Sequence, residues 1–189
     1  MISKLAKSIA HFFVVQNITE ESKEVIYAYG MELLISDVLN TIIVLLIALF
    51  SHTLPAVVVF IAVFMGLRQF VGGFHANSHL SCMFTLVMVM MVFSYGICNV
   101  SGHITPIFSI SFIMIALPII LCIAPVPHPN KPMSEEKSVK LRKRSCILAV
   151  TLSVVTIALL VFQYQKLSLY VSSGMLLSAI MALLGHFLN

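Results

Sequence analysis

Six long apolar segments alternate with short polar segments along the chain. They cover roughly residues 31–50, 54–71, 82–100, 104–124, 146–162 and 167–188. A helix of about 20 residues is about 30 Å long, which matches the thickness of the hydrocarbon core of a bilayer. The pattern therefore predicts an all-α, polytopic membrane protein with about six transmembrane helices. The second and fifth segments are the shortest, and a tilt or a locally thinner bilayer would let them cross.

The chain begins with a different pattern, in which apolar and basic residues share one helix. A helix over residues 2–15 gathers its large apolar side chains near one face: Ile2, Leu5, Ile9, Phe12 and Phe13. The basic residues lie on the other faces, as is typical of a helix in the membrane interface. The sequence thus predicts an amphipathic N-terminal segment over residues 1–28, followed by a single transmembrane domain over residues 29–189.

The composition excludes a soluble domain. Of the 189 residues, 60% are apolar and only 10% are charged, and the mean hydropathy is +1.06. Soluble domains are about 45–50% apolar and about 25% charged. Eleven Lys or Arg and seven Asp or Glu cannot cover a water-facing surface of this size. Disordered chains and coiled coils are excluded for the same reason, so the expected surroundings are a lipid bilayer.

Basic residues gather between the fourth and fifth apolar segments. The stretch 125–145 holds six Lys or Arg and two Glu, and it accounts for the whole net charge of +4. One basic stretch between apolar segments is typical of a cytoplasmic loop and not of a nucleic-acid groove. With six crossings, this orientation places ten of the eleven basic residues, both termini and the turn 68–82 on the cytoplasmic side of the cell membrane.

The turn between the second and third apolar segments is the most polar stretch outside the basic loop and the termini. Its residues include one arginine, two glycines, two histidines and one cysteine: Arg68, Gly72, Gly73, His75, His79 and Cys82. The double glycine should end the preceding helix and allow a tight turn of the backbone. This turn is therefore the candidate site of chemistry.

Cys82 is a candidate nucleophile, with His75 or His79 as its general base. On one unbroken helix, His75 and Cys82 would lie about 10.5 Å apart along the axis, too far for proton transfer. If His75 lies on the turn and Cys82 opens the next helix, the turn can bring the two together. The helix dipole would then lower the pKa of the Cys82 thiol. An imidazole beside the thiol completes an activated nucleophile.

Other interpretations of these residues stay open at this point. The two histidines and the cysteine, at i, i+4 and i+7, share a helix face and could supply three ligands to a zinc ion. A cysteine at a helix end often serves packing alone. Glu32, Asp37 and Arg68 could instead line the pathway of a small transporter or channel, since acids within a membrane are rare and mostly functional.

Two short motifs mark these polar stretches: Arg68…Gly72-Gly73-Phe74-His75-Ala76…Cys82 and Ala124-Pro125…Asn130-Lys131-Pro132. Together they resemble the accessory gene regulator B (AgrB) family. Its members are membrane cysteine endopeptidases that process quorum-sensing propeptides in Gram-positive bacteria. The resemblance extends over nearly the whole chain, through the amphipathic start, the six hydrophobic segments and the basic stretch after the fourth.

The resemblance implies a role for each matching residue. The essential His and Cys of the family fall on His75 and Cys82, which favours His75 over His79 as the base. The family's arginine and glycine fall on Arg68 and Gly73. Arg68 and the backbone of the double glycine are then candidates to stabilise the oxyanion or to position the substrate. The resemblance implies no cofactor and no metal, and the sequence names no third catalytic residue.

The implied activity is the cleavage and cyclisation of a short propeptide. The C-terminal tail leaves, the remaining peptide forms a thioester with the enzyme, and an internal Cys or Ser captures the acyl group as a thiolactone or lactone. Family substrates carry an amphipathic helix and an acidic tail, so Lys131, Arg142, Lys143 and Arg144 are candidates for binding the tail. Contact with lipid headgroups is the other interpretation of these cations. A homodimer is left open.

Overall fold

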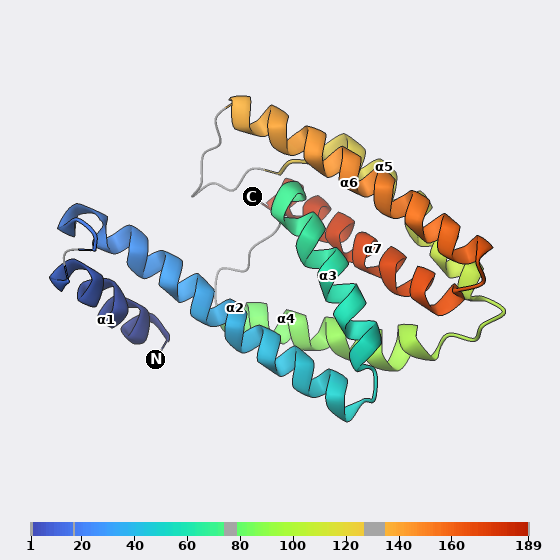
Figure 1. Ribbon diagram of the computed structural model, residues 1–189, viewed down its shortest axis with the longest axis horizontal. Helices are drawn as coiled ribbons and strands as arrows, with labels where there is room; N and C mark the ends of the chain where they lie inside the picture. Colours follow the sequence, from blue (N-terminus) through green and yellow to red (C-terminus); the bar gives the residue numbers. More distant parts are fainter. Residues whose placement is uncertain (1, 17, 74–78, 127–134, 189) are drawn as a thin grey trace.

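Helices make up nearly all of the part of the chain that the structure, a computed structural model, describes (Figure 1). That part comprises residues 2–16, 18–73, 79–126 and 135–188, without the side chains of Leu33, Asp37, residues 79–83 and Leu188. In chain order the elements are α1 (Ile2–Val15), the 3₁₀ turn η1 (Glu21–Lys23), α2 (Glu24–Phe50), α3 (Leu54–Val71), α4 (His79–Met91), the π-helical turn η2 (Val92–Gly96), the 3₁₀ turn η3 (Ile97–Asn99), α5 (Thr105–Ile123), α6 (Glu135–Val161) and α7 (Gln165–Leu188).

The all-α membrane architecture predicted from the hydrophobic pattern is confirmed. Helices α2, α3, α5, α6 and α7 are each long and apolar enough to cross a membrane. A shorter apolar helix, Phe84–Asn99, lies in the third predicted segment. The predicted number of six transmembrane helices requires that this segment crosses the membrane too. The bounds of α3 match the predicted segment 54–71, because Pro55 suits a first helical turn and Gly72 adopts the positive φ that ends the helix.

The prediction of a loop over the whole stretch 125–145 is wrong. Helix α6 begins at Glu135 and carries five of the six basic residues of that stretch. Glu135 and Glu136 in its first turn favour the start of a helix through their interaction with the helix dipole. Lys140 forms an ion pair with Glu136 one turn later. Hydropathy alone does not distinguish a loop from a helix that continues beyond the hydrocarbon core.

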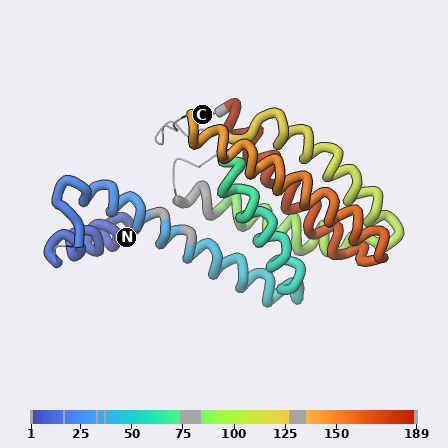
Figure 2. Tube along the Cα trace, turned by 45° about the horizontal axis from the view of Figure 1, so that its top comes forward, coloured from blue at the N-terminus to red at the C-terminus, as the bar shows by residue number. Residues whose placement is uncertain are grey.

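Helix α7 is the central helix of a bundle that it forms with α3, α5 and α6 (Figure 2). Its membrane span is 56% buried, whereas the spans of those three helices are 22–33% buried. Small side chains predominate in the buried core where the four helices meet, which consists of Leu67, Val71, Ala116, Ile120, Ala124, Val126, Ala149, Met175, Ala179 and Ala182. Small residues let membrane helices approach closely, which is how such helices associate when lipid competes for every apolar contact.

Hydroxyl groups and one glycine complete the contacts of α7. Ser168 and Ser109 of α5 share a hydrogen bond of 3.1 Å between their Oγ atoms. The Ser178 hydroxyl donates to the Phe64 carbonyl of α3 at 3.4 Å. A Cβ atom at Gly174 would lie 2.9 Å from the Phe60 carbonyl oxygen. The close approach of α3 and α7 therefore requires glycine at position 174.

The third apolar segment is fixed to α7 at its end. After α4, the chain passes through η2 and η3, and the Lys166 ammonium group donates to the carbonyl oxygens of Cys98 at 3.0 Å and Val100 at 2.6 Å. Carbonyl groups at a helix end lack intrahelical partners, so the lysine satisfies them. Phe93 of η2 also stacks on Phe60 of α3, with ring centroids 4.2 Å apart.

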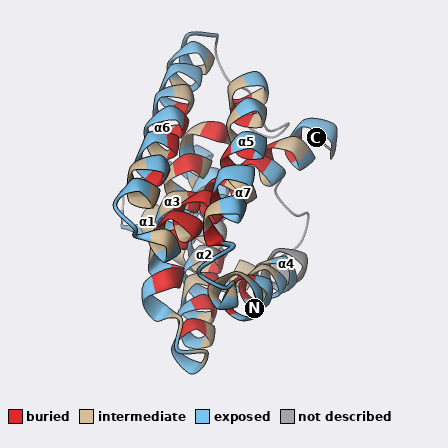
Figure 3. Ribbon diagram, turned by 90° about the vertical axis from the view of Figure 1, so that its right-hand side faces the viewer, coloured by how far each residue is buried: buried red, intermediate tan, exposed pale blue. Residues whose placement is uncertain are grey.

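Helix α1 and the first part of α2 pack along each other and project away from the bundle, whereas the end of α2 packs against α3 (Figures 1 and 2). The helix predicted over residues 2–15 is present, and its Ala6 and Ala10 are fully buried. Figure 3 shows exposed positions along the outer faces of the bundle helices. Many of them are large apolar residues, such as Ile107, Met114 and Val154. Such a surface suits contact with lipid.

Candidate active site

The double glycine at the end of α3 forms a turn whose conformation needs glycine. Gly72 has a φ of 74° and Gly73 a φ of 132°, a region that residues with a side chain rarely adopt. A Cβ atom at Gly72 would lie 2.5 Å from the Val126 carbonyl oxygen. One at Gly73 would lie 2.7 Å from the Met181 carbonyl oxygen of α7. The turn therefore docks by its backbone directly onto two other parts of the chain.

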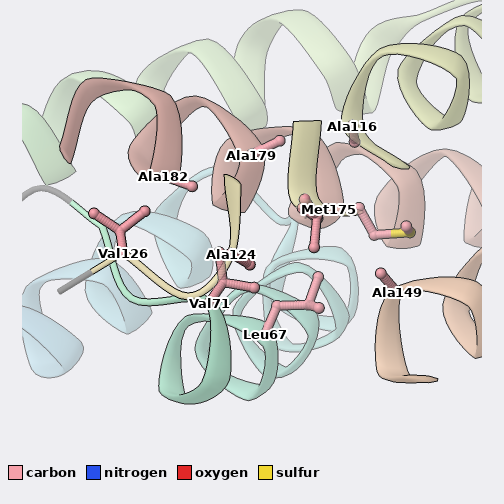
Figure 4. Close-up of a cluster of buried hydrophobic side chains, with 10 residues drawn as sticks. Leu67, Val71, Ala116, Ala124, Val126, Ala149, Met175, Ala179 and Ala182 are labelled. Atoms are coloured by element: carbon pink, nitrogen blue, oxygen red, sulfur yellow. The ribbon is translucent and has the colours of Figure 1, made fainter. Parts of the chain in front are cut away.

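A short backbone pairing joins this turn to the segment that follows α5. The Val126 N–H donates to the Val71 carbonyl oxygen at 2.9 Å, and Gly72 and Val126 form a parallel β-bridge. The preceding peptide bond, Ala124-Pro125, is cis. Figure 4 shows Val71, Ala124 and Val126 beside Ala182 of α7. The double glycine is thus paired with Val126, which directly follows Ala124-Pro125 although the two motifs lie far apart in the sequence.

Arg68 lies on the last turn of α3, directly before the double glycine. Its guanidinium carbon lies 5.5 Å from the centre of the Phe64 ring, within the range of a cation–π contact. Its carbonyl oxygen accepts a hydrogen bond from the Gly72 N–H at 3.0 Å, which closes the helix. The side chain is half-buried. Arg68 therefore places a cation on the last turn of α3, four residues before Gly72.

The predicted nucleophile lies at the start of a helix. Helix α4 begins at His79, so Cys82 is in its first turn. The predicted interaction of its thiolate with the helix dipole requires this placement. The side chains of His79 and Cys82 lie outside the described part of the chain, as does His75 altogether. The distance between base and nucleophile therefore stays a prediction.

Three of the four predicted tail-binding cations lie on the first turns of α6. Arg142, Lys143 and Arg144 are all exposed, and within the described ranges none of them forms an ion pair. The fourth, Lys131, lies outside those ranges. The contact between the double glycine and Val126 is called the junction below. Helix α6 begins nine residues after Val126, so its basic residues lie close in sequence to the junction.

The zinc interpretation depends on residues that the structure does not describe. Among the described residues, no group of three His, Cys, Asp or Glu side chains could hold a metal ion. The proposed ligand set, however, includes His75 and the side chains of His79 and Cys82, which lie outside them. The choice between a zinc site and a nucleophile is therefore left to experiment.

Sequence reasoning missed the part that α7 plays in this site. Its Met181 and Ala182 form the surface onto which Gly73 docks, and its Ala179 and Ala182 are fully buried in the adjoining core. The available signal was the row of small residues in the last apolar segment, which is typical of close helix packing. That signal does not show which other segment of the chain packs its backbone against α7.

The helices and this junction define a multi-pass α-helical membrane protein in which two polar segments meet beside the end of a central helix. Comparison with known proteins gives the family. Residues 3–182 match the family model of accessory gene regulator B, AgrB. The chain belongs to the AgrB family, and this membership supports a role in quorum-sensing peptide processing.

A relative has a matching description. A protein of Clostridium beijerinckii described as AgrB-like is 25% identical over 145 residues, which are 75% of this chain and 71% of the relative. No solved structure matches the chain. The arrangement of the junction is therefore known here from this chain's own structure.

Replacing Gly73 by alanine should destabilise the junction. The added Cβ atom would meet backbone atoms of α7, which cannot move without displacing the helix. A clash with backbone and a strained φ cost about 1–3 kcal/mol. We expect a lower midpoint of thermal unfolding in detergent micelles. Gly30→Ala on α2 is the matched control, because nothing lies within 4 Å of its added atom; equal midpoints for both variants would contradict the docking.

Proposed function

We propose that this AgrB-family protein is a cysteine endopeptidase that removes the C-terminal tail of a quorum-sensing propeptide and cyclises the remaining peptide. The observation that carries the proposal is the family match over residues 3–182, with the family's Cys motif ending in the first turn of α4. The transporter interpretation has no such support.

The proposed reaction begins with attack by Cys82. Its thiolate attacks the carbonyl carbon of the scissile peptide bond, and His75 accepts the thiol proton. The tetrahedral intermediate collapses with loss of the tail, whose amine takes the proton back from His75. The product is a thioester between Cys82 and the new C-terminal carbonyl of the peptide. The helix dipole of α4 favours the thiolate at this position.

The oxyanion of the intermediate needs a donor, and Arg68 is the best-supported one. Its guanidinium lies at the end of α3, and it carries several N–H groups. The Gly72 N–H already donates to Arg68 within the helix cap. We therefore assign Gly72 and Gly73 a conformational role: they let the turn dock and so direct the polar segment toward the substrate.

The second step transfers the acyl group within the peptide. An internal Cys thiol, or a Ser hydroxyl, attacks the thioester carbonyl and releases the Cys82 thiolate, giving a thiolactone or lactone ring. Exchange of one thioester for another is nearly isoenergetic, so exclusion of water decides between ring closure and hydrolysis. The apolar surroundings of α3, α5 and α7 suit this exclusion.

The proposed location follows from the distribution of charge. Basic residues concentrate on α1 and on the first turns of α6. We therefore propose that these turns lie on the cytoplasmic side of a Gram-positive cell membrane, together with both termini and the active site. A newly made propeptide, with its amphipathic helix on the membrane surface, would reach the site from that side. Its acidic tail would then meet Lys131 and the exposed Arg142, Lys143 and Arg144.

Co-expression with the propeptide tests the activity. We expect wild type to release the tail, and Cys82→Ala and His75→Ala to release none, while His79→Ala stays active. The readout is the mass of the peptide products, with membrane insertion of each variant checked by fractionation. Chelator treatment of membranes is expected to leave processing unchanged.

The outcomes separate the alternatives. Tail release by correctly inserted Cys82→Ala would refute the peptidase. If only His79→Ala were inactive, the site would be correct but His79, and not His75, would be its general base. Loss of processing on chelation, restored by zinc, would favour the metal site.

Neutralising the cations of α6 tests the tail contact. We expect the triple variant Arg142→Gln, Lys143→Gln, Arg144→Gln to process an acidic-tailed propeptide about threefold to tenfold more slowly at low salt, because attraction raises the local substrate concentration. Lys137 and Lys140 stay in place to preserve the orientation in the membrane.

A propeptide with a neutral tail is the control. Wild type and the triple variant should process it at equal rates. An equal loss with both tails would show that these cations serve insertion or lipid contact and not the tail.

A further inference from the structure

Helix α1 turns small residues, and not its largest ones, toward α2. It packs mainly against α2, and its Ala6 and Ala10 are fully buried. The large apolar side chains of Leu5 and Phe12, seven residues apart on another side of the helix, are 54% and 55% exposed. The packing of α1 on α2 therefore leaves an apolar face of α1 open to the surroundings.

A second open face of α1 is basic. Lys4, Lys7 and His11 recur every three or four residues, so they share one side of the helix. The His11 Nδ1 atom lies 3.4 Å from the Glu24 Oε1 atom of α2. Both lysines are exposed, and no acidic side chain in the described part of the chain forms an ion pair with either of them. Their ammonium groups are thus available to a partner outside the chain.

Helix α1 folds back along α2, so that the two helices are antiparallel (Figures 1 and 2). Near the turn between them, His11 pairs with Glu24, and the rings of Phe13 and Tyr27 meet edge to face with their centroids 6.3 Å apart. The two lysines lie about one and two helical turns further from the chain reversal. Counted from these two contacts, they are level with about residues 28–36 of α2.

This level is one end of the apolar part of α2. The apolar segment 31–50 is about 30 Å long as a helix and matches the thickness of the hydrocarbon core. Its first residue, Met31, therefore marks one border of that core. The two lysines lie at this border, which is the depth of the lipid headgroups, and Leu5 lies between them in the sequence.

We propose that Lys4 and Lys7 bind the headgroups of anionic membrane lipids while Leu5 inserts among the adjoining acyl chains. A helix that combines a basic face with an open apolar face binds a membrane surface through both the charges and the buried apolar area. The lysines supply the charge, and their place at the border of the core lets them reach the lipid phosphates. The inference concerns the contact of the chain with lipid and does not depend on peptidase activity.

A second copy of the chain fits this face less well than lipid. Two copies in one membrane are related by an axis along the membrane normal, so equivalent residues lie at the same depth. A contact through this face would bring Lys4 and Lys7 of one copy close to those of the other, and like charges repel. Charge complementarity favours a negatively charged occupant.

Fluorescence quenching by brominated lipids tests the inference. Because the chain has no tryptophan, Leu5→Trp gives the full-length protein a single reporter on the open apolar face. The variant is reconstituted into nanodiscs with equal amounts of phosphatidylcholine and phosphatidylglycerol, in which only one of the two lipids carries brominated acyl chains. We expect stronger quenching when the phosphatidylglycerol is brominated, because each lysine near an anionic surface favours association about fivefold.

Two changes should abolish this preference. Salt at about 1 M shortens the Debye length to about 3 Å and screens exposed charges. In the same Leu5→Trp background, the double substitution Lys4→Gln, Lys7→Gln removes the charges themselves. Both lipids should then quench equally. Lys23→Gln is the matched control, because Lys23 lies next to the chain reversal and pairs with Glu20 at 3.1 Å; this variant should keep the preference.

Equal quenching by the two lipids at low salt would overturn the inference, as would a preference that survives the double substitution. Quenching by neither lipid would also overturn it, and would show that a second copy or another protein segment covers this face. None of these outcomes bears on the peptidase, which is decided by the cleavage activity of Cys82→Ala.

Discussion

A contact between backbone atoms at the end of α3 joins two segments that lie far apart in the sequence. Gly72 and Gly73 dock on the carbonyl groups of Val126 and Met181, at distances that leave no room for a Cβ atom. The hydrogen bond from Val126 to Val71 closes the same contact. The ends of α3 and α5 and the last turns of α7 are thereby fixed relative to one another. One polar stretch of the chain follows Gly73 and the other follows Val126.

The helices form two groups around that contact. Helices α3, α5, α6 and α7 form a tightly packed bundle, in which small residues and serine hydroxyls replace the large side chains of a soluble core. Helices α2 and α4 pack against each other beside it, and α2 buries the polar residues Ser36 and Asn40. The bundle thus holds the double glycine against Val126 and Met181, whereas Cys82 belongs to α4.

Hydropathy was sufficient to predict the five helices that are long and apolar enough to cross a membrane, because the bilayer imposes a length and an apolar composition on each of them. It was insufficient at α6, where charged residues continue the helix beyond the apolar region and look like a loop. The double glycine was recognisable as a turn, but its partners Val126 and Met181 lie far away in sequence, and spacing carries no information about such a pairing.

The central claim is that Cys82 carries the peptide between cleavage and ring closure. Its most direct test is mass spectrometry of the purified protein after brief reaction with a propeptide whose internal Cys or Ser is replaced by alanine. The account predicts an adduct on Cys82 with the mass of the tail-less peptide, which hydroxylamine removes as expected of a thioester. Release of the tail without such an adduct, or an adduct on another residue, would contradict it.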